Sequence, residues 1–426
     1  MKYNKIQRSW AMYDWANSVY SLVISTVLLP IYYEALTKDN DAKVCFLGYF
    51  WENTVIYNYV IAASFLTISI FSPYLGAMAD KTGRRKVFMN IFMITGGVST
   101  MLMYFFTSVN PGFALVLAYF ASLGFTGSFV FYNSYLPIIA PKEMQDRLSA
   151  RGFSFGYLGS GLLLIFCLAL IQMPEFFGLA DAAIATRVSF LITGVWWLGF
   201  GLPAIGRLPK DEVKDYFETK LFWSSWKELI IVLKELGQQP ALRRFLSGFF
   251  WYSTGMQTII LLAAVFGSKV LGLESTQLIV TILIIQFVAI AGAVAFSRLS
   301  ERTSNIFAIS LGVAIWMVIC LIAYFVQTAT EFYVVSIGLG FVMGAVQSLS
   351  RSTYSKMLPK TEDHSTYFSF YDVMEKLATT VGMFSIGILE WLTGDLRNSA
   401  LALSLFFAIG LVHMLRLHVF QKKSAT

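Results

Sequence analysis

The sequence has little charge. Asp, Glu, Lys and Arg make up 13% of its 426 residues, whereas 57% of the residues are hydrophobic and 16% are aromatic. A soluble domain has about 25% charged residues, so this composition excludes an ordinary water-soluble domain. We therefore expect an integral membrane protein.

Cysteine and histidine are also scarce. Cys167 and Cys320 lie within apolar runs, and His364, His413 and His418 form no cluster with other ligands, so neither a disulfide framework nor a metal-ligand spacing is present. The chain has no glycine-rich phosphate loop that ends in lysine and a hydroxyl residue, and no His-Glu-x-x-His string. We expect no metal, no cofactor, no ATP-driven step and no enzymatic activity.

Long apolar segments recur along the whole chain. Each holds roughly 20 residues or more, which at about 1.5 Å per residue crosses a hydrocarbon core of about 30 Å. The pattern predicts an all-α membrane protein with twelve transmembrane helices. The segments lie near 12–36, 55–79, 87–107, 113–139, 152–173, 182–205, 245–270, 277–296, 306–328, 332–357, 367–392 and 400–420.

The basic residues lie mostly on one side of these segments. If the loops alternate between the two sides, 26 of the 32 Lys and Arg residues fall on the same side. Cytoplasmic loops are enriched in Lys and Arg, so both termini are expected in the cytoplasm. This bias also accounts for the net charge of +7 without a nucleic-acid partner.

A charged stretch divides the segments into two groups of six. Residues 1–206 form the first half, 245–426 form the second, and 207–244 form a cytoplasmic linker. Apolar residues recur through the linker at helical spacing, which predicts an amphipathic helix on the membrane surface. The linker could be a simple tether or a regulatory site. The spaced residues are Val213, Phe217, Leu221, Trp226, Leu229, Leu233 and Leu236.

Residues 76–86, GAMADKTGRRK, follow the second apolar segment directly. This loop resembles the one between helices 2 and 3 of the major facilitator superfamily, through Gly76, Ala79, Asp80, Gly83, Arg84, Arg85 and Lys86. The resemblance implies a conformational latch in which Asp80 lies against the amides at residues 365–367, where the eleventh helix begins. The alternative is that the charges only set the topology, which would leave Asp80 without a role.

The second half contains a degenerate copy of this loop. Residues 297–305 align with 76–84, so that Glu301 corresponds to Asp80 and Arg302 to Lys81. Two six-helix halves of parallel topology are the architecture of the major facilitator fold, which we therefore expect here.

The first predicted helix carries one polar stripe, formed by Asp14, Asn17, Ser18, Ser21 and Ser25. Lipid cannot satisfy such groups, so the stripe must face protein or a water-filled cavity. Helix packing through small hydroxyls is one alternative. For Asp14, a second alternative is that a helix N-terminus stabilises the carboxylate.

The string Tyr13 to Ser18, YDWANS, is similar to the first helix of a branch of this superfamily that groups bacterial permeases with fungal vacuolar amino-acid effluxers. The branch is echoed around Asn133, Tyr157, Gln347, Arg351 and Asp372. The resemblance implies a transporter that exports amino acids or a similar metabolite, with these residues near its solute or coupling site.

Two further features concern the predicted fifth and seventh helices. Gly152, Gly156, Gly159 and Gly161 allow a close helix approach, which we expect to be toward a helix of the other half. The branch commonly has an acidic residue where this chain has Thr254, so a coupling role at that position is in doubt. Gln257, one turn later, still offers neutral hydrogen bonds.

The eleventh predicted helix carries charges deep within its length. Asp372 and Lys376 are four residues apart and therefore lie on one face, with Glu375 turned about 100° away. An unpaired ammonium inside a membrane costs at least about 2.5 kcal/mol, so Lys376 needs a partner. Arg351 could compete for either carboxylate. The pair could bind a solute or relay a proton, form a purely structural ion pair, or let Lys376 extend toward the cytoplasm.

Together these patterns predict a secondary active transporter that works by alternating access. It would act as a monomer in a bacterial inner membrane, with an organelle membrane as the second choice, and protons are a candidate coupling ion. The rival class is a non-transporting receptor or solute sensor on the same fold, which solute flux in proteoliposomes would separate from a transporter.

Overall fold

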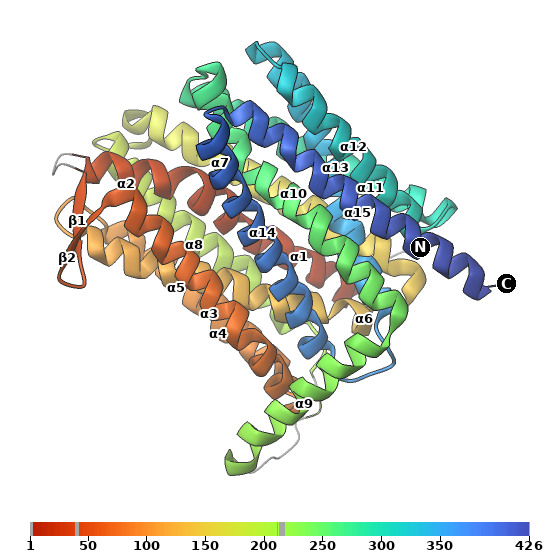
Figure 1. Cartoon of the computed structure of the whole chain (residues 1–426). Coiled ribbons are helices and arrows are strands. Elements are labelled where there is room, and N and C mark those ends of the chain that lie inside the picture. Colours follow the sequence, from red (N-terminus) through yellow and green to blue (C-terminus); the bar gives the residue numbers. More distant parts are fainter. Residues whose placement is uncertain (1–2, 39–41, 211, 213–217, 426) are drawn as a thin grey trace. The chain divides into compact units, whose positions relative to one another are not determined.

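A computed structural model describes residues 3–38, 42–210, 212 and 218–425 of the chain (Figure 1). Among these residues, eleven helices are long and apolar enough to cross a membrane. The chain divides into two compact units, the first comprising Met1–Tyr135 and Phe155–Ser225 and the second Leu136–Ser154 and Trp226–Thr426. The major facilitator fold predicted from the sequence is thus confirmed at the level of an all-α membrane protein.

Unit 1 is built on helix pairs. Within it α4 packs against α5 and α8, α3 packs against α5, and α1 packs against α8. A Cβ added to Gly124 of α5 would lie 2.5 Å from the Cα of Gly96, so glycine is needed for the close approach of α4 and α5. The elements are α1 (Lys5–Val19), η1 (Tyr20–Leu28), α2 (Leu29–Thr37), β1 (Lys43–Phe46), β2 (Tyr49–Glu52), α3 (Asn53–Thr82), α4 (Arg85–Leu102), η2 (Met103–Phe105), α5 (Pro111–Ser134), α7 (Lys142–Gln172) from Phe155 onward, η3 (Pro174–Phe177) and α8 (Ala182–Gly206).

Unit 2 takes a segment from the first half of the sequence. Residues 136–154, which include α6 (Leu136–Ile139) and the first part of α7, belong to it. Its main packing pairs are α11 with α13, α10 with α15, α12 with α15 and α10 with α14. The remaining elements are α9 (Glu218–Gln238) from Trp226 onward, α10 (Pro240–Leu271), α11 (Ser275–Arg302), α12 (Asn305–Phe325), α13 (Ala329–Met357), α14 (His364–Thr393) and α15 (Leu396–Ala425).

Helix α14 (His364–Thr393) corresponds to the eleventh predicted span. It is 30 residues long, or about 45 Å at 1.5 Å per residue, so its length suffices to cross a bilayer. It is not among the eleven apolar spans of the described chain. Four charged residues interrupt it: Asp372, Glu375, Lys376 and Glu390.

The first span, Lys5–Thr37, is not a uniform α-helix. Residues Tyr20–Leu28 form a π-helix, in which the Thr26 hydroxyl also donates a 2.8 Å hydrogen bond to the carbonyl of Ser21. π-helical segments inside α-helices are rare and frequently lie at functional sites. The regular spacing expected for the polar stripe therefore holds for Asp14 and Asn17 but is altered at Ser21 and Ser25.

A β-hairpin that the sequence analysis did not predict joins the first two spans. Strands β1 and β2 pair antiparallel, with Val44 opposite Trp51 and Phe46 opposite Tyr49. Leu47 and Gly48 form the turn, and both have positive φ. The sequence signal for this hairpin was an alternation of apolar residues around the Leu47-Gly48 pair. Leucine rarely adopts positive φ, so the signal was weak.

Candidate functional site

Helix α14 brings the predicted charged pair together. Lys376 Nζ lies 3.8 Å from Asp372 Oδ1, and the side chains are 20% and 5% exposed. This distance is longer than a hydrogen bond, so the two groups attract each other without being tightly joined. The pairing of Asp372 with Lys376 on one helix face is as the spacing predicted.

The other oxygen of the Asp372 carboxylate has no hydrogen-bond partner. Asp372 Oδ2 is buried and unpaired among the residues that the structure describes. A buried polar atom without a partner costs about 1–3 kcal/mol, and such atoms are few in folded proteins. This oxygen is therefore a vacant acceptor beside the half-buried ammonium of Lys376.

Two more predicted residues meet next to this pair. Gln257 of α10 donates from Nε2 to Oε1 of Glu375 on α14. Gln257 and Glu375 are both half-buried. Thus the amide of Gln257 on α10 and the carboxylate of Glu375 on α14 form a polar contact. Glu375 directly precedes Lys376 in the sequence.

Aromatic rings line the neighbouring turn of α14. Tyr371 stacks on Phe249 of α10 at 4.4 Å between centroids and lies 5.0 Å from the ring of Tyr354 on α13. The Tyr252 hydroxyl lies 2.8 Å from the Ser350 hydroxyl. These packed rings leave α14 little freedom, which holds Asp372 at a fixed depth.

Thr254 is fully buried and its hydroxyl donates to the carbonyl of Phe250 at 2.8 Å. Thr258 makes the same type of bond to the carbonyl of Thr254. Both hydroxyls therefore satisfy their own helix. This fits the expectation that position 254 has no carboxylate-type role here.

Arg351 is buried within unit 2 and binds the segment 136–154. Its Nε donates to the Ser149 hydroxyl and its Nη2 to the Ser149 carbonyl, both at 2.9 Å. The guanidinium also lies over the ring of Phe153, 4.2 Å from its centroid. These contacts direct Arg351 toward α7. The sequence analysis expected Arg351 to compete for the carboxylates of α14 and did not predict its contacts with α7.

A second buried ion pair, absent from the sequence analysis, holds the same segment. Asp146 Oδ2 lies 2.5 Å from Lys356 Nζ, and the Asp146 side chain is 2% exposed. Asn305 donates to Oδ1 at 2.7 Å, and the Ser300 hydroxyl donates to Oδ2 at 3.0 Å. The sequence signal that could have indicated this pair was an acidic residue, Asp146, among the basic residues of a predicted cytoplasmic loop. We call Asp146, Lys356, Asn305 and Ser300 the Asp146 cluster.

The degenerate loop copy of the second half also contacts this segment. Glu301 accepts two hydrogen bonds from the guanidinium of Arg147, the longer of them 2.5 Å from Nη2. Arg302 is exposed. Glu301 therefore holds a cation from the sequence's first half, whereas the latch role proposed for Glu301 and Arg302 stays a prediction.

In unit 1 the buried carboxylate has a neutral partner. The Tyr132 hydroxyl donates to Asp14 Oδ2 at 2.7 Å, and Trp10 stacks on the Tyr132 ring at 4.5 Å. Helix α1 begins at Lys5, earlier than the sequence suggested, so Asp14 lies in its third turn. The helix dipole acts within the first turn, and stabilisation by the N-terminus does not explain Asp14.

The predicted neutral residues are mostly buried. Asn17 Oδ1 accepts from the Ser128 hydroxyl at 3.4 Å, while its Nδ2 is buried without a partner. Asn133 and Tyr157 are buried, and Ser21 is half-buried within η1. Their contact with a solute stays a prediction. The same holds for Gln347, which is half-buried on α13.

Gly156 and Gly159 of α7 pack within their own unit. A Cβ at Gly156 would overlap the hydroxyl of Ser18, and one at Gly159 would lie 2.9 Å from the Trp15 ring. Both neighbours are on α1. The expectation that these glycines face a helix of the other half was wrong, because the aromatic side chain of Trp15 needs the space they leave.

The loop 76–86 closes on itself. Arg85 Nη2 lies 2.8 Å from Asp80 Oδ1, and both side chains are buried. Gly83 takes the left-handed conformation with φ of 63° that ends α3, and Arg84 is exposed. Lys86 donates to the carbonyls of Gly206 and Leu208 at the end of α8, where a cation is favourable. The predicted contact of Asp80 with residues 365–367 stays a prediction.

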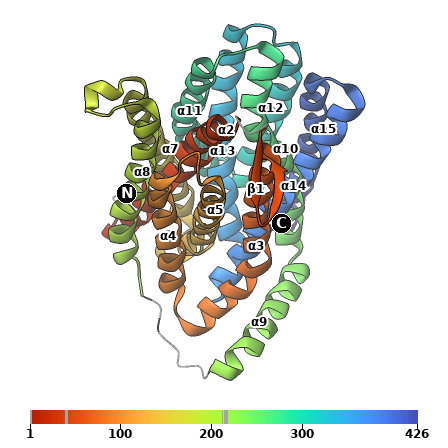
Figure 2. The same ribbon diagram turned by 90° about the vertical axis from the view of Figure 1, so that its left-hand side faces the viewer.

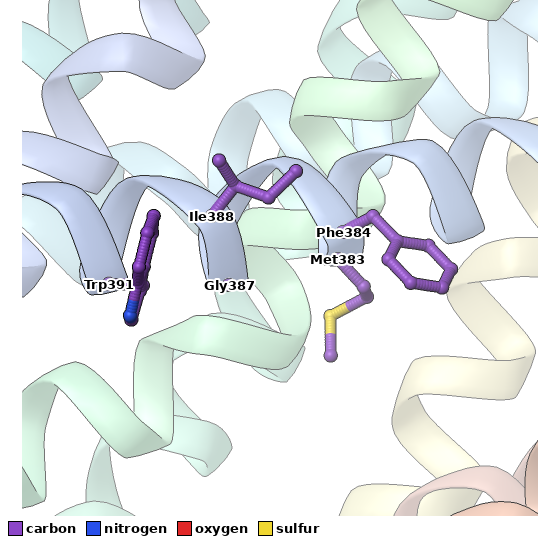
Figure 3. A pocket seen from close by; sticks show the side chains of 5 residues that line it. All are labelled: Met383, Phe384, Gly387, Ile388 and Trp391. Carbon is purple, nitrogen blue, oxygen red and sulfur yellow. The ribbon is translucent and has the colours of Figure 1, made fainter.

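One apolar pocket lies beyond the charged part of α14. It has a volume of about 390 Å³ and is lined by Met383, Phe384, Gly387, Ile388 and Trp391. Figure 3 shows these side chains projecting from one helix. The lining is apolar and includes none of the predicted site residues. It therefore suits an apolar surface rather than recognition of a polar solute.

Metal chemistry has no counterpart in the part of the chain that the structure describes. No group of three or more His, Cys, Asp or Glu residues there could hold a metal ion.

Comparison with known proteins adds the family. Residues 2–426 match the family model described as "Vacuole effluxer Atg22 like". The chain is 31% identical over 415 residues to the MFS-type transporter YxiO of Bacillus subtilis, covering 96% of this chain and 94% of that protein. It is 23% identical to Autophagy-related protein 22 of Yarrowia lipolytica, covering 89% of this chain and 79% of that protein.

Solved structures support the same fold. The transporter FucP, in its outward conformation, matches with a TM-score of 0.69 at 13% identity, covering 97% of each chain. At this identity the likeness concerns the fold alone.

Proposed function

Because the chain belongs to the vacuole effluxer Atg22-like family of major facilitator transporters, we propose that it exports a small zwitterionic solute, an amino acid or a related metabolite, by alternating access. Family membership sets it among transporters rather than enzymes. The observation that supports a zwitterion is the loosely joined Asp372–Lys376 pair on α14.

The pair offers both charges that a zwitterion needs. The Lys376 ammonium, 3.8 Å from Asp372 Oδ1, is the proposed partner of a solute carboxylate. Asp372 Oδ2 is a vacant acceptor suited to a solute ammonium. The amide of Gln257 adds a neutral donor that is now held by Glu375. The amides of Asn17 and Asn133 on unit 1 are proposed as further neutral contacts.

Protons are the proposed coupling ion. A proton on Asp372 would remove its attraction for Lys376 and its ability to accept from a solute ammonium. Protonation and solute binding would then exclude each other at one carboxylate, which is the requirement for exchange of a proton against a solute.

The predicted halves, 1–206 and 245–426, would rock about this site, joined by the linker 207–244. Asp80 is proposed as the latch of one state, with Arg85 holding its carboxylate in place. Asp80→Asn should then shift the accessibility labelling of introduced cysteines toward the inward-open state. The matched control is Lys81→Gln, which removes an adjacent charge, and equal labelling in both variants would count against the latch.

The location in the cell is also a proposal, supported by the distribution of Lys and Arg along the chain. We propose a bacterial inner membrane with both termini cytoplasmic and a monomeric protein. The organelle membrane of the fungal relatives is the second choice.

The direct test is a two-step assay on purified protein. A thermal-shift screen of the twenty amino acids identifies ligands, since a ligand stabilises the state that it binds. Each hit is then tested for flux in proteoliposomes with and without a pH gradient. Stabilisation without flux would overturn transport in favour of a solute sensor, and flux that ignores the pH gradient would overturn proton coupling.

A further inference from the structure

Helix α9 has two apolar faces, and only one of them is covered by protein. Val232 and Leu236 are buried. Trp226, Ile230 and Leu233 are 42%, 49% and 56% exposed. At about 100° per residue the centres of these two sets lie roughly 100° apart around the helix, so they form neighbouring but distinct faces. The single amphipathic face expected from the sequence therefore combined residues of two different surfaces. Two of its members, Val213 and Phe217, lie outside the described residues, as does the side chain of Leu221.

The covered face fixes α9 to unit 2. Besides Val232 and Leu236, Glu235 Oε2 accepts a 2.6 Å hydrogen bond from the Tyr367 hydroxyl in the first turn of α14. The Tyr354 hydroxyl in turn donates to the Tyr367 carbonyl at 2.5 Å. The exposed apolar face is thus held in a defined orientation.

The exposed face has lysines beside it. Lys227 and Lys234 are exposed and, by helical geometry, border the row of Trp226, Ile230 and Leu233 on one side. Apolar residues that include tryptophan, bordered by lysines, are typical of helices that lie in the headgroup region of a bilayer. We call these five residues the α9 lipid face.

The chain keeps this face close to the membrane. Helix α9 ends at Gln238 and the span α10 begins at Pro240, so one residue separates them (Figure 2). Lys and Arg counts set this end of α10 on the cytoplasmic side, where the leaflet carries anionic lipid.

We propose that the α9 lipid face is a binding site for anionic phospholipids of the cytoplasmic leaflet. Trp226, Ile230 and Leu233 enter the headgroup boundary, while Lys227 and Lys234 bind lipid phosphates. Through Glu235 and Tyr367, the bound position of α9 is linked to the start of α14. The site is independent of the proposed solute and is tested without any transport assay.

The test uses the full chain in nanodiscs. A Cys45→Ser background removes the exposed native thiol, and Ile230→Cys then carries an environment-sensitive fluorophore. In nanodiscs that contain phosphatidylglycerol and a shallow nitroxide-labelled lipid, the probe should be quenched. In phosphatidylcholine nanodiscs with the same amount of the nitroxide-labelled lipid, it should be quenched much less. Lys227→Gln with Lys234→Gln should weaken the response to phosphatidylglycerol by about thirty-fold, at about tenfold per 1.4 kcal/mol and about 1 kcal/mol per lysine.

The matched control replaces Lys142 and Lys360, which are exposed basic residues of two other cytoplasmic loops, by glutamine. This pair should leave the quenching unchanged. Equal quenching in neutral and anionic nanodiscs would overturn the role of anionic lipid. A probe that stays in water in both nanodiscs would overturn membrane docking altogether and point to a protein partner.

Discussion

The buried carboxylates of Asp14 in unit 1 and of Asp146 and Asp372 in unit 2 have different kinds of partner, whereas Asp80 of unit 1, at the end of α3, pairs with Arg85. In unit 1 the buried carboxylate of Asp14 is satisfied by a neutral tyrosine hydroxyl, at 2.7 Å. In unit 2 buried carboxylates face cations, as in Asp146 with Lys356 and Asp372 with Lys376. A neutral hydrogen bond needs no counter-charge when a helix moves, whereas an ion pair in a low dielectric does. The charge chemistry of transport is therefore expected in unit 2.

The largest effect should follow from removing the ammonium of α14. Lys376→Met should lower solute transport by about a hundredfold or more, because one charge of a buried pair is lost and its partner is left unpaired. Flux in proteoliposomes with matched amounts of inserted protein measures it. Lys269→Met is the control, since Lys269 pairs with Glu390 at 3.5 Å on an exposed surface and should change flux by less than about twofold. Parental flux in Lys376→Met would end the solute-binding hypothesis.

The next effect concerns stability. Asp146→Asn should lower the free energy of unfolding by about 3 kcal/mol, because it leaves Lys356 without its buried partner. In a thermal melt of the purified protein this corresponds to a drop of roughly 3 °C, since the unfolding entropy scales with chain length. Glu301→Gln removes an exposed pair in the same region and should cost about 1 kcal/mol or less. Equal melting temperatures for the two variants would show that the Asp146 cluster is not a special contact of unit 2.

In unit 1 the expected weakness is steric. Gly156→Ala places a methyl group against the Ser18 hydroxyl and should destabilise the protein by about 1–3 kcal/mol. Gly199→Ala on α8 meets nothing within 4 Å and should be neutral or slightly stabilising. A melt that ranks the two alanine variants in the opposite order would contradict the close contact of α7 with α1.

The smallest effect should come from the carboxylate of unit 1. Asp14→Asn keeps an oxygen that can accept from Tyr132, so flux should change by less than about threefold and keep its pH dependence. The same assay as for Lys376 measures it. A loss as large as that of Lys376→Met would break the distinction between the neutral partner of Asp14 and the charged partner of Asp372.

Local patterns were predictable and long-range contacts were not. The spans follow from apolar length, and the Asp372–Lys376 pair follows from residues four apart on one helix. The contact of Asp14 with Tyr132 joins residues 118 positions apart, and that of Asp146 with Lys356 joins residues 210 apart. Such pairings depend on how helices pack, which no period in one sequence encodes.

Helix α9 illustrates the limit within a single element. Its apolar spacing predicted a helix correctly. The two faces could not be separated, because burial of Val232 and exposure of Ile230 depend on what the helix packs against. The π-helix in the first span was missed for a similar reason, since its residues fit an ordinary α-helix equally well.

That π-helix also determines where the first span can change its length. Each backbone bond in Tyr20–Leu28 reaches one residue further than in an α-helix, so the segment holds a surplus residue. Deleting one residue there would return the chain to α geometry and leave the orientation of Lys5–Val19 relative to Leu29–Thr37 nearly intact. The same deletion in α1 would turn everything before it by about 100°. In the evolution of this span, insertions and deletions should therefore collect between Tyr20 and Leu28.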